Sequence, residues 1–540
     1  MSSSNETALD PAQSVRFTAI KATEEVRSLE SVVKKILTST VYEIARETPI
    51  THAPVLSGKL GNDVKIKRED MQPVFSFKIR GAYNMMSRLS EAQKKAGVIC
   101  ASAGNHAQGV AISAKALGIA ATIVMPTVTP GIKINAVRAY GANVILQGSV
   151  FDEALQHAFQ LREQNGMTFV PPYDHIDIIA GQGTCGMEIV RQLPGRLDAV
   201  FVPVGGGGFI AGVAAYIKYV RPSVKIIGVQ SEDSAALKAA LEEGRLVRLS
   251  ETGVFADGVS VAQIGFNPWA LIHAHQLVDD VITCTTDEMC AAIKDMFEDT
   301  RGVAEPAGAL SLAGLKKYVQ ATGVKGQTLV CINSGANLNF DRLQYIAERT
   351  MTGEQREVLM AVTFAEGRSN FLGIFDALGK RAVTEAIYRF TDVSVGKLYL
   401  GVQVSPGGQD RADVIDVLRK GAYGVLDLTD NELAKNHIRY LGGGRAGRAI
   451  EECVYRFEFP ERTGALLRFM RKLPVSWNIT LVHYRNHGTA WASTLIGFEV
   501  PVDERGAVQT VLSGCGARFW NETDNTAFGV FVKTHDQSVN

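Results

Sequence analysis

The sequence has no long hydrophobic run and no excess of charge of either sign. Its longest apolar stretches, such as Gly118 to Met125, are too short to span a bilayer. Its 56 Lys and Arg residues balance 56 Asp and Glu residues, so the formal net charge is +0. Proteins that bind nucleic acid or anionic membranes usually carry a basic excess. We therefore expect neither a nucleic-acid partner nor a membrane partner.

Paired cysteines are also missing. The seven cysteines are scattered and include no C-x-x-C pair, which indicates reduced thiols in a cytosol-like compartment and no zinc site. Residues 1–28 form a polar tail without the apolar core of a secretory signal, and Glu6, Asp10 and Glu24 are atypical of an organelle transit peptide. We expect a cytoplasmic protein, with an organellar location left open.

What the sequence does contain is enough material for several domains, since it has 540 residues of which 46% are hydrophobic. A helical pattern runs from Leu29 to Ala45. Short Val/Ile strands then alternate with helices, as in the strand Val98–Ser102, the helix Asn105–Leu117 and the strand Ala121–Met125. This alternation predicts an α/β region of parallel sheets covered on both faces.

After about Arg349 the pattern changes to a duplication. Phe364-Ala365-Glu366-Gly367-Arg368-Ser369-Asn370-Phe371-Leu372 parallels Phe459-Pro460-Glu461-Arg462-Thr463-Gly464-Ala465-Leu466-Leu467, and a strand ending in Tyr-Arg follows each stretch. The two copies are predicted as α+β units over residues 355–432 and 451–536, with a hinge at Gly442–Arg445 between them.

Lys78 is the candidate catalytic residue, in the stretch Ser76-Phe77-Lys78-Ile79-Arg80-Gly81, where a helix is expected to follow Gly81. Most lysines lie on the surface, so the simple interpretation is a solvated side chain. A partly desolvated amine would instead have a lowered pKa and could act as nucleophile and base.

A run of four glycines between the strand Ala199–Val204 and the helix from Phe209 is a candidate phosphate site (Gly205, Gly206, Gly207, Gly208). The backbone N–H groups and the helix start would face an anion. A close-packed turn or a dinucleotide loop would look similar. The dinucleotide reading fits less well, because Val229-Gln230 stands where a ribose-binding acid is expected.

Two polar residues stand at element ends. Asn105 opens the helix after the strand Val98–Ser102, where a plain N-cap is one interpretation. Ser334, in Ser334-Gly335-Ala336-Asn337, ends the last parallel strand, where serine is often only a turn former.

Taken in order, the stretches around Lys78, Asn105, Gly205 and Ser334 resemble those of the fold-type-II pyridoxal-phosphate enzymes. The resemblance is closest to the biosynthetic threonine ammonia-lyases and runs from about Leu29 to the C-terminus. It implies a catalytic region over residues 29–349, with two parallel-sheet subdomains, followed by two ACT-like regulatory units.

The resemblance also implies roles for individual residues. Lys78 would hold pyridoxal 5'-phosphate as a Schiff base and take the substrate's α-proton. The cofactor would contact the residues Phe77, Asn105, Gly205, Gly206, Gly207, Gly208, Phe209 and Ser334. The substrate carboxylate would lie at the loop Ser102, Ala103, Gly104, Asn105 and His106.

The implied reaction is β-elimination, which turns L-threonine into 2-oxobutanoate and ammonia, with L-serine as a further substrate. A neutral Ser334 facing the pyridine nitrogen would leave the cofactor a weaker electron sink than a carboxylate would, which favours prompt loss of a β-leaving group. Glu305 is expected to support the site from a helix start. Gln230 stands where some relatives place a cation-binding carboxylate, so we predict no metal site.

The regulatory units imply inhibition by isoleucine, with valine as an opposing ligand, across a homotetramer. The candidate effector contacts are Phe371, Arg381, Glu461 and Leu466, although Phe371 and Leu466 also suit plain helix packing. Two other functions remain open: a serine dehydratase, racemase or β-replacing synthase on the same scaffold, and a non-catalytic amino-acid sensor. The two regulatory copies count against the first of these, and the intact site residues against the second.

Overall fold

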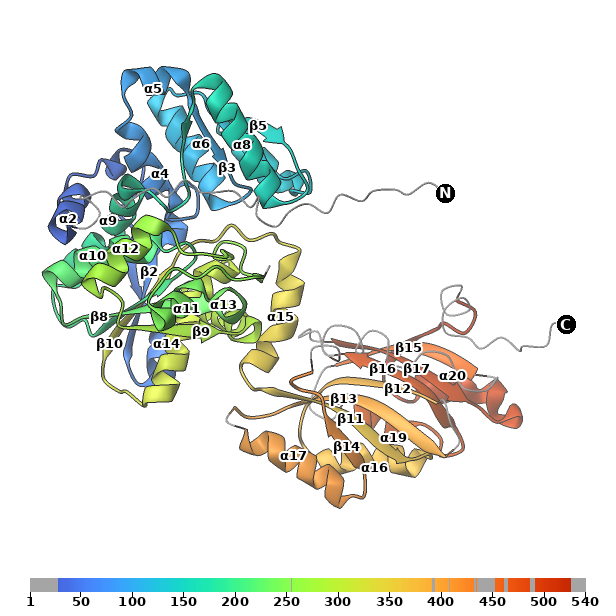
Figure 1. The fold of residues 1–540 in the computed structure, drawn as a ribbon. Helices are drawn as coiled ribbons and strands as arrows, with labels where there is room; N and C mark the ends of the chain where they lie inside the picture. The colour runs from blue at the N-terminus through green and yellow to red at the C-terminus, as the bar shows by residue number, and fades with distance from the viewer. Residues whose placement is uncertain are drawn as a thin grey trace, which may run out of the picture. The chain divides into compact units, whose positions relative to one another are not determined.

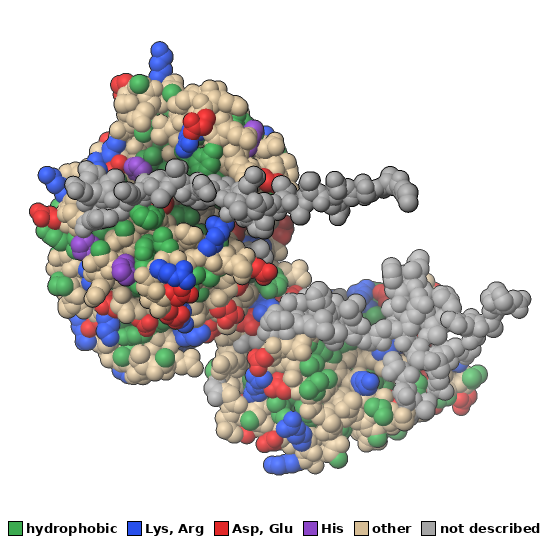
Figure 2. Space-filling view, in the orientation of Figure 1, with side chains coloured by type: hydrophobic (Ala, Val, Ile, Leu, Met, Phe, Trp, Pro, Cys, Tyr) green, Lys and Arg blue, Asp and Glu red, His purple; other side chains and the backbone are tan. Residues whose placement is uncertain are grey.

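The computed structural model describes residues 28–253, 255–390, 394–406, 408–431, 434, 452–460, 465–485 and 491–525. The chain divides into two compact units, residues 1–350 and 351–540 (Figure 1). On the face drawn in Figure 2, basic and acidic side chains are interspersed over both units. Among the described residues, no helix has the length and apolar character needed to cross a membrane.

The first unit contains a six-stranded sheet in the order β1-β2-β10-β7-β8-β9. All neighbouring strands are parallel except β1, which pairs antiparallel with β2 at one edge. The strands are β1 (Ile50–His52), β2 (Asp63–Arg68), β7 (Ala199–Pro203), β8 (Lys225–Ser231), β9 (Asp280–Cys284) and β10 (Thr328–Asn333).

Helices cover both faces of this sheet. Along β10, Val330 and Ile332 point to one core, whereas Leu329 and Cys331 point to the other, as the two-residue period of a strand requires. One face packs on α2 (Leu29–Leu37), α9 (Ile176–Gln192), α10 (Gly208–Val220), α11 (Ala236–Glu243) and α12 (Phe266–His275). The other packs on α3 (Pro54–Leu60), α13 (Thr286–Thr300), α14 (Pro306–Thr322) and α15 (Arg342–Gly353).

A second, four-stranded sheet in the same unit has the order β5-β4-β3-β6 and is parallel throughout. Its strands are β3 (Val98–Ala101), β4 (Ala121–Met125), β5 (Asn143–Leu146) and β6 (Thr168–Phe169). One face packs on α4 (Lys78–Ser87), α6 (Asn105–Leu117) and α7 (Gly131–Ala139), and the other on α8 (Phe151–Asn165). A short helix, α5 (Glu91–Ala96), precedes β3. The predicted pair of parallel α/β sheets is therefore confirmed.

One helix prediction was too long. The helix expected from Leu29 to Ala45 ends at Leu37, and only a short 3-10 turn, η2 (Val41–Glu43), follows it. The reason lies in the run Thr38-Ser39-Thr40, since hydroxyl side chains compete for backbone groups. The Thr38 hydroxyl donates a hydrogen bond to the carbonyl of Lys34 at 2.9 Å.

The second unit contains one eight-stranded antiparallel sheet in the order β14-β11-β13-β12-β16-β17-β15-β18. The first copy contributes β11 (Glu357–Ala365), α16 (Arg368–Leu378), β12 (Val383–Arg389), β13 (Val395–Gln403), α17 (Gln409–Lys420) and β14 (Gly424–Asp427). The second contributes β15 (Glu452–Pro460), α19 (Ala465–Lys472), β16 (Asn478–Arg485), β17 (Trp491–Glu499), α20 (Val508–Ser513) and β18 (Arg518–Asn521).

The two copies share one element order, strand-helix-strand-strand-helix-strand, as the duplication predicts. They join where β12 pairs antiparallel with its counterpart β16, so the strand order reads the same from both edges of the sheet. The predicted hinge at Gly442–Arg445 and the effector candidate Glu461 lie outside the described residues.

Candidate active site

Lys78 is the first residue of α4, four residues earlier than the helix start expected after Gly81. Its amine donates a hydrogen bond to the carbonyl oxygen of Pro172 at 2.8 Å. Burial lowers the pKa of Lys78 to about 8, although the nearby carboxyl of Glu305 acts in the opposite direction. The interpretation as a solvated surface lysine is therefore wrong.

The residues before Lys78 are held against the end of β10. The N–H of Phe77 donates to the carbonyl of Ser334 at 3.2 Å, and Ser76 forms an isolated antiparallel bridge with Gly335. The Ser334 side chain is buried there, and its hydroxyl donates to the carbonyl of Ala307 at 3.3 Å. These contacts bring the Lys78 stretch and the Ser334 stretch together.

Asn105 does not act as a helix cap. Gly104 occupies the N-cap position of α6, and Asn105 is the first helical residue, so the N-cap interpretation is wrong. Its side-chain Nδ2 donates to Glu305 Oε1 at 2.6 Å, and its Oδ1 accepts a hydrogen bond from Asn337 Nδ2 at 2.7 Å. In the described part of the chain, the other Nδ2 hydrogen of Asn105 has no partner and is free to bind a further group.

Glu305 is the acid at the start of α14, but it makes no side-chain cap there. Its carboxyl turns to Asn105 instead, and the residue as a whole is 5% exposed. Burial raises the pKa of Glu305 to about 7, and the charge of Asp257 adds to the shift. A Cβ at Gly335 would stand 2.5 Å from Glu305 Oε1, so any other residue at this position would displace the carboxyl.

The glycine run joins β7 to α10, and Gly207 caps the helix with φ of 89°, a left-handed conformation that favours glycine. A Cβ at Gly206 would collide with the ring of Tyr173, and one at Gly208 would lie 2.6 Å from the Tyr173 carbonyl. Within the described part of the chain, the N–H groups of Gly205, Gly206 and Gly207 have no hydrogen-bond partner. They are open donors at a helix start.

Aromatic stacking joins this run to Lys78. The rings of Phe77 and Phe209 stack with centroids 3.9 Å apart and planes at 17°. The Lys78 amine lies 5.3 Å from the centroid of Phe77. Its acceptor, Pro172, adjoins Tyr173, which packs on the glycines.

The expected substrate loop precedes α6. Ser102 Oγ accepts a hydrogen bond from the N–H of Gly104 at 3.2 Å, across Ala103. His106 is 4% exposed, and its Nε2 is 2.8 Å from the carbonyl of Val170. Burial lowers the pKa of His106 to about 3, so its ring is neutral and occupied in the core.

Three neighbours of the site were not anticipated: Pro172, Tyr173 and Asn337 in the role of an Asn105 partner. Pro172 and Tyr173 lie just after the short strand β6, at the same sheet edge as the ends of β3 and β4. The Pro171-Pro172 pair after a β-rich segment was the one available signal. It marks a turn but not the direction of a carbonyl.

Gln230 is buried on β8, and its amide is fully used by local backbone. Its Oε1 accepts from the N–H groups of Leu237 and Lys238, both at 3.0 Å, and its Nε2 donates to the Ser234 carbonyl at 3.2 Å. The side chain therefore pins the start of α11.

The described effector candidates are engaged by neighbouring side chains. Phe371 is 2% exposed and packs against the rings of Phe375 and Tyr388, while Leu466 is 4% exposed in the same core. The packing alternative thus describes both side chains. Arg381 forms an ion pair with Asp410 at 3.0 Å.

The residues present fit pyridoxal phosphate. Open N–H donors at a helix start suit a phosphate, an amine with a lowered pKa suits an aldehyde, and the free Nδ2 hydrogen of Asn105 suits a ring oxygen. Together with the two parallel sheets, these features define a pyridoxal-phosphate-dependent enzyme.

Comparison with known proteins narrows this class. Residues 41–335 match the family model described as pyridoxal-phosphate dependent enzyme, and residues 348–438 and 443–532 each match the C-terminal regulatory domain of threonine dehydratase. The chain is 50% identical over 500 residues to the L-threonine dehydratase biosynthetic IlvA of Escherichia coli, covering 93% of this chain and 96% of that protein. It is 46% identical over 515 residues to the mitochondrial threonine dehydratase of Saccharomyces cerevisiae, covering 93% and 89%.

Solved structures agree. The processed form of threonine deaminase isoform 2 from Solanum lycopersicum matches with a TM-score of 0.58 and 48% identity, covering 59% of this chain and 93% of that one. Maize serine racemase matches with a TM-score of 0.55 and 29% identity, covering 59% and 97%. The chain belongs to the biosynthetic threonine dehydratases, and the family resemblance inferred from its sequence is confirmed.

Proposed function

We propose that this protein deaminates L-threonine to 2-oxobutanoate and ammonia, as the first committed step of isoleucine biosynthesis, under feedback inhibition by isoleucine. One observation carries the proposal: 50% identity to a biosynthetic threonine dehydratase extends over 93% of the chain, through both the catalytic unit and the duplicated regulatory unit. The overall reaction balances, because the water lost with the β-hydroxyl is regained when the released enamine is hydrolysed.

In this proposal Lys78 would hold the cofactor aldehyde, and the N–H groups of Gly205 to Gly208 and Phe209 would hold its phosphate. Phe77 would contact the cofactor, the Asn105 amide would bind its ring oxygen, and the Ser334 hydroxyl would be the partner of its ring nitrogen. The bound cofactor supplies an electron sink for the charge left on the substrate's α-carbon.

The proton chemistry follows from burial. Because the pKa of Lys78 is lowered to about 8, a useful fraction of its amine is neutral near neutral pH and can accept the α-proton. Ser334 is uncharged, so it would place no fixed negative charge against the ring nitrogen of the cofactor. This would favour prompt loss of the β-hydroxyl.

The substrate carboxylate is assigned to the turn before α6. The backbone N–H groups around Ala103 and Asn105, and the Ser102 hydroxyl, supply donors at a helix start. His106 contributes through its backbone, since its ring is committed to Val170.

Regulation is assigned to the second unit, with isoleucine as inhibitor and valine as opposing ligand, near α16 and α19. Arg381 and Glu461 would provide charged contacts to the ligand's zwitterion. Phe371 and Leu466 would act by packing those helices. We further propose a homotetramer and a cytosolic location; all seven cysteines are free thiols, as a reducing compartment favours.

The experiment is a keto-acid assay on the purified protein with L-threonine, with and without isoleucine, alongside a visible absorbance spectrum. We expect a cofactor band, 2-oxobutanoate production and suppression by isoleucine. The likeness to serine racemase supports a second candidate, L-serine, so the assay is repeated with it. Turnover of serine alone would replace threonine as the substrate, and absence of a band after adding cofactor would favour an amino-acid sensor.

A further inference from the structure

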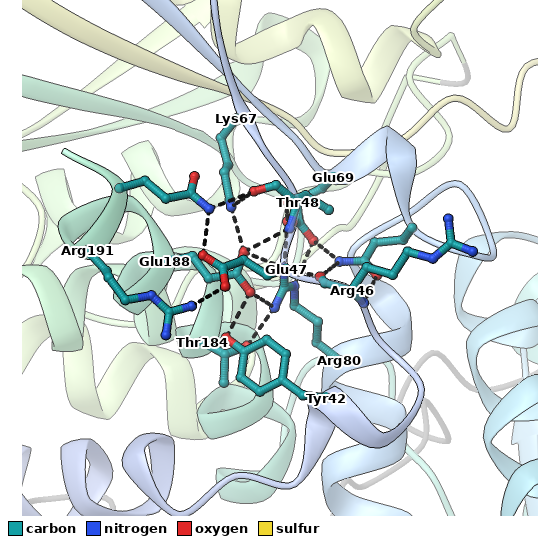
Figure 3. Close-up of polar contacts among 12 residues, drawn as sticks. Tyr42, Arg46, Glu47, Thr48, Lys67, Glu69, Arg80, Thr184, Glu188 and Arg191 are labelled. Carbon is teal, nitrogen blue, oxygen red and sulfur yellow. Dashed lines mark hydrogen bonds and ion pairs between the residues drawn. The ribbon is translucent and has the colours of Figure 1, made fainter.

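Four charged side chains are buried together beneath the start of α4. We name Lys67, Glu69, Arg80 and Glu188 the buried charge cluster, and the side chains of all four are fully inaccessible to solvent (Figure 3). They come from β2, the 3-10 turn η3 (Glu69–Met71), α4 and α9. The cluster contains two cations and two anions, so it is neutral as a whole.

Arg80 is the centre of the cluster, and every nitrogen of its guanidinium is bonded. Nε and Nη2 donate to the two carboxylate oxygens of Glu69 at 2.7 and 2.8 Å. Nη1 and Nη2 donate to those of Glu188 at 2.6 and 2.9 Å. Thr184 Oγ1 and the Arg46 carbonyl accept the remaining bonds at 3.0 and 3.2 Å. Such two-sided forks fix direction as well as distance.

The outer members are equally satisfied. Lys67 Nζ donates to Glu188 and to the Thr48 carbonyl, both at 2.5 Å. Tyr42 donates its hydroxyl proton to Glu188 at 2.8 Å. Burial alone would raise the pKa of Glu69, but the charge and hydrogen bonds of Arg80 outweigh it and lower that pKa. Glu69 is therefore held in its ionised form beside Arg80.

Stability alone does not explain such a cluster. Desolvating buried ions costs about as much as their pairing returns, and apolar side chains of similar volume often stabilise a fold as well or better. What an apolar core cannot provide is a single orientation for the backbone that carries the guanidinium. The cluster therefore has a role in orienting the part of α4 that carries Arg80.

Arg80 lies two residues after Lys78, on the first turn of α4. Two glycines let neighbouring helices approach this turn closely. A Cβ at Gly109 of α6 would be 3.1 Å from the Lys78 carbonyl, and one at Gly181 of α9 would be 2.6 Å from the Arg80 carbonyl. The turn is thus clamped through its backbone on two sides and through the Arg80 side chain from beneath.

We propose that Arg80 is a positioning residue for Lys78: its forks to Glu69 and Glu188 set the rotation and depth of the first turn of α4, so that the Lys78 amine stands at the Pro172 carbonyl beside the glycine run. This inference rests on the role proposed for Lys78. The effect is geometric, because the cluster is neutral and the charged or titratable groups that face Lys78 are Glu305 at the start of α14 and His106 of α6.

The test compares Arg80→Lys with Lys67→Met in the full-length chain. The first keeps the charge but loses both forks on α4. The second removes a buried cation from the same cluster, on β2, and leaves the forks to α4 in place. Two quantities are measured: kcat and KM for threonine in the holoenzyme, and the pH dependence of Lys78 acetylation by acetic anhydride in cofactor-free protein, read by mass spectrometry.

For Arg80→Lys we expect kcat to fall by on the order of ten- to a hundredfold with KM little changed, since a displacement of about 1 Å can cost that much. The pKa from acetylation should rise from about 8 toward the ordinary 10.5, as a loosened turn admits water. Lys67→Met should lower the urea midpoint at least as much as Arg80→Lys does. It should leave kcat for threonine and the acetylation pKa of Lys78 near the values of the original protein.

Equal losses of kcat in the two variants, in proportion to their stability, would overturn the proposal, as would an unchanged Lys78 pKa in Arg80→Lys. Should Arg80→Lys not fold, Glu69→Gln breaks one fork with Arg80 intact, and the same shift in acetylation is required of it. If the original protein proves inactive on threonine, the proposed function fails, while the acetylation pKa still decides the positioning.

Discussion

The two units of this chain bury charge in different ways. The catalytic unit encloses a cluster of two basic and two acidic side chains directly under the helix that carries Lys78. The regulatory unit instead has a large apolar core under a symmetric antiparallel sheet, with the Arg389–Glu452 pair among its buried ions. Buried charges cost stability but fix the orientation of the groups that they bond. Apolar packing stabilises the fold but is not directional. Chemistry in the first unit therefore depends on single polar atoms, and regulation in the second on whole packed elements.

The largest expected effect tests the first half of this contrast. Lys78→Ala should remove the visible cofactor band and lower threonine turnover by at least about a thousandfold, because the attachment point and the base are lost together. The urea midpoint should change little, since one buried amine with one hydrogen bond is removed. Lys94→Ala, at a lysine of α5 that pairs with the exposed Glu91, is the matched control and should be fully active. Normal threonine turnover in Lys78→Ala would show that Lys78 takes no part in the reaction.

The second prediction tests the apolar unit. Trp477 is 0% exposed, and its Nε1 donates to Glu504 at 2.8 Å. Trp477→Ala should destabilise residues 351–540 by about 3–5 kcal/mol through cavity formation. Urea unfolding should then show an earlier transition for this unit, with isoleucine inhibition lost and basal turnover retained.

Trp520→Ala is its control, because that side chain is 40% exposed and should cost well under half as much. Loss of basal turnover in Trp477→Ala, with the catalytic unit still folded, would show that the two halves do not divide their work as proposed.

A third prediction concerns the joint between the regulatory copies. Arg368, the first residue of α16, donates to four carbonyls in the last turn of α19 and the segment after it: Met470 at 3.1 Å, Leu473 at 2.9 Å, Pro474 at 2.6 Å and Trp477 at 2.7 Å. Burial lowers the pKa of Arg368, yet a guanidinium still suits a helix C-terminus. Arg368→Met should cost about 1–3 kcal/mol by leaving these carbonyls unpaired.

The same variant should make the isoleucine response less cooperative, since the first copy would lose its hydrogen bonds to the second copy. Arg419→Met, at an exposed position of α17, provides the baseline. Thermal unfolding and an inhibition curve measure both effects. An unchanged inhibition curve, with stability lowered, would limit Arg368 to a structural role.

Local patterns were enough to predict most of this architecture. The strand β4 and the helix α6 have the bounds expected from their apolar periods, and the duplicated units follow from matching stretches. What local patterns could not supply were partners far apart in the sequence. Asn105 suited an N-cap by its position, but Glu305, 200 residues later, takes its amide. Likewise, nothing around Arg80 indicates that Glu188 faces it, because that contact depends on the packing of α4 against α9.

The smallest expected effect is a change in how the free energy of unfolding depends on pH. It compares Glu305 with the carboxylates of the buried charge cluster, which are paired with cations. Glu305 is buried, no cation among the described residues is bonded to it, and burial raises its pKa from 4.5 to about 7. The folded protein therefore binds a proton there that the unfolded chain has released, so this group makes the free energy of unfolding fall as pH rises from 4.5 to 7. Glu305→Gln cannot titrate but still offers Asn105 an acceptor, and it should remove that fall.

Urea unfolding of cofactor-free protein between pH 4.5 and 7 measures this fall, with Glu251→Gln, at an exposed position, as the control. Asp257 and Lys133, whose charges also act on Glu305, are present in both proteins, so the difference between their slopes isolates this carboxyl. Equal slopes would mean that Glu305 is ionised when buried, and that a cation such as Lys78 compensates it more strongly than the geometry implies.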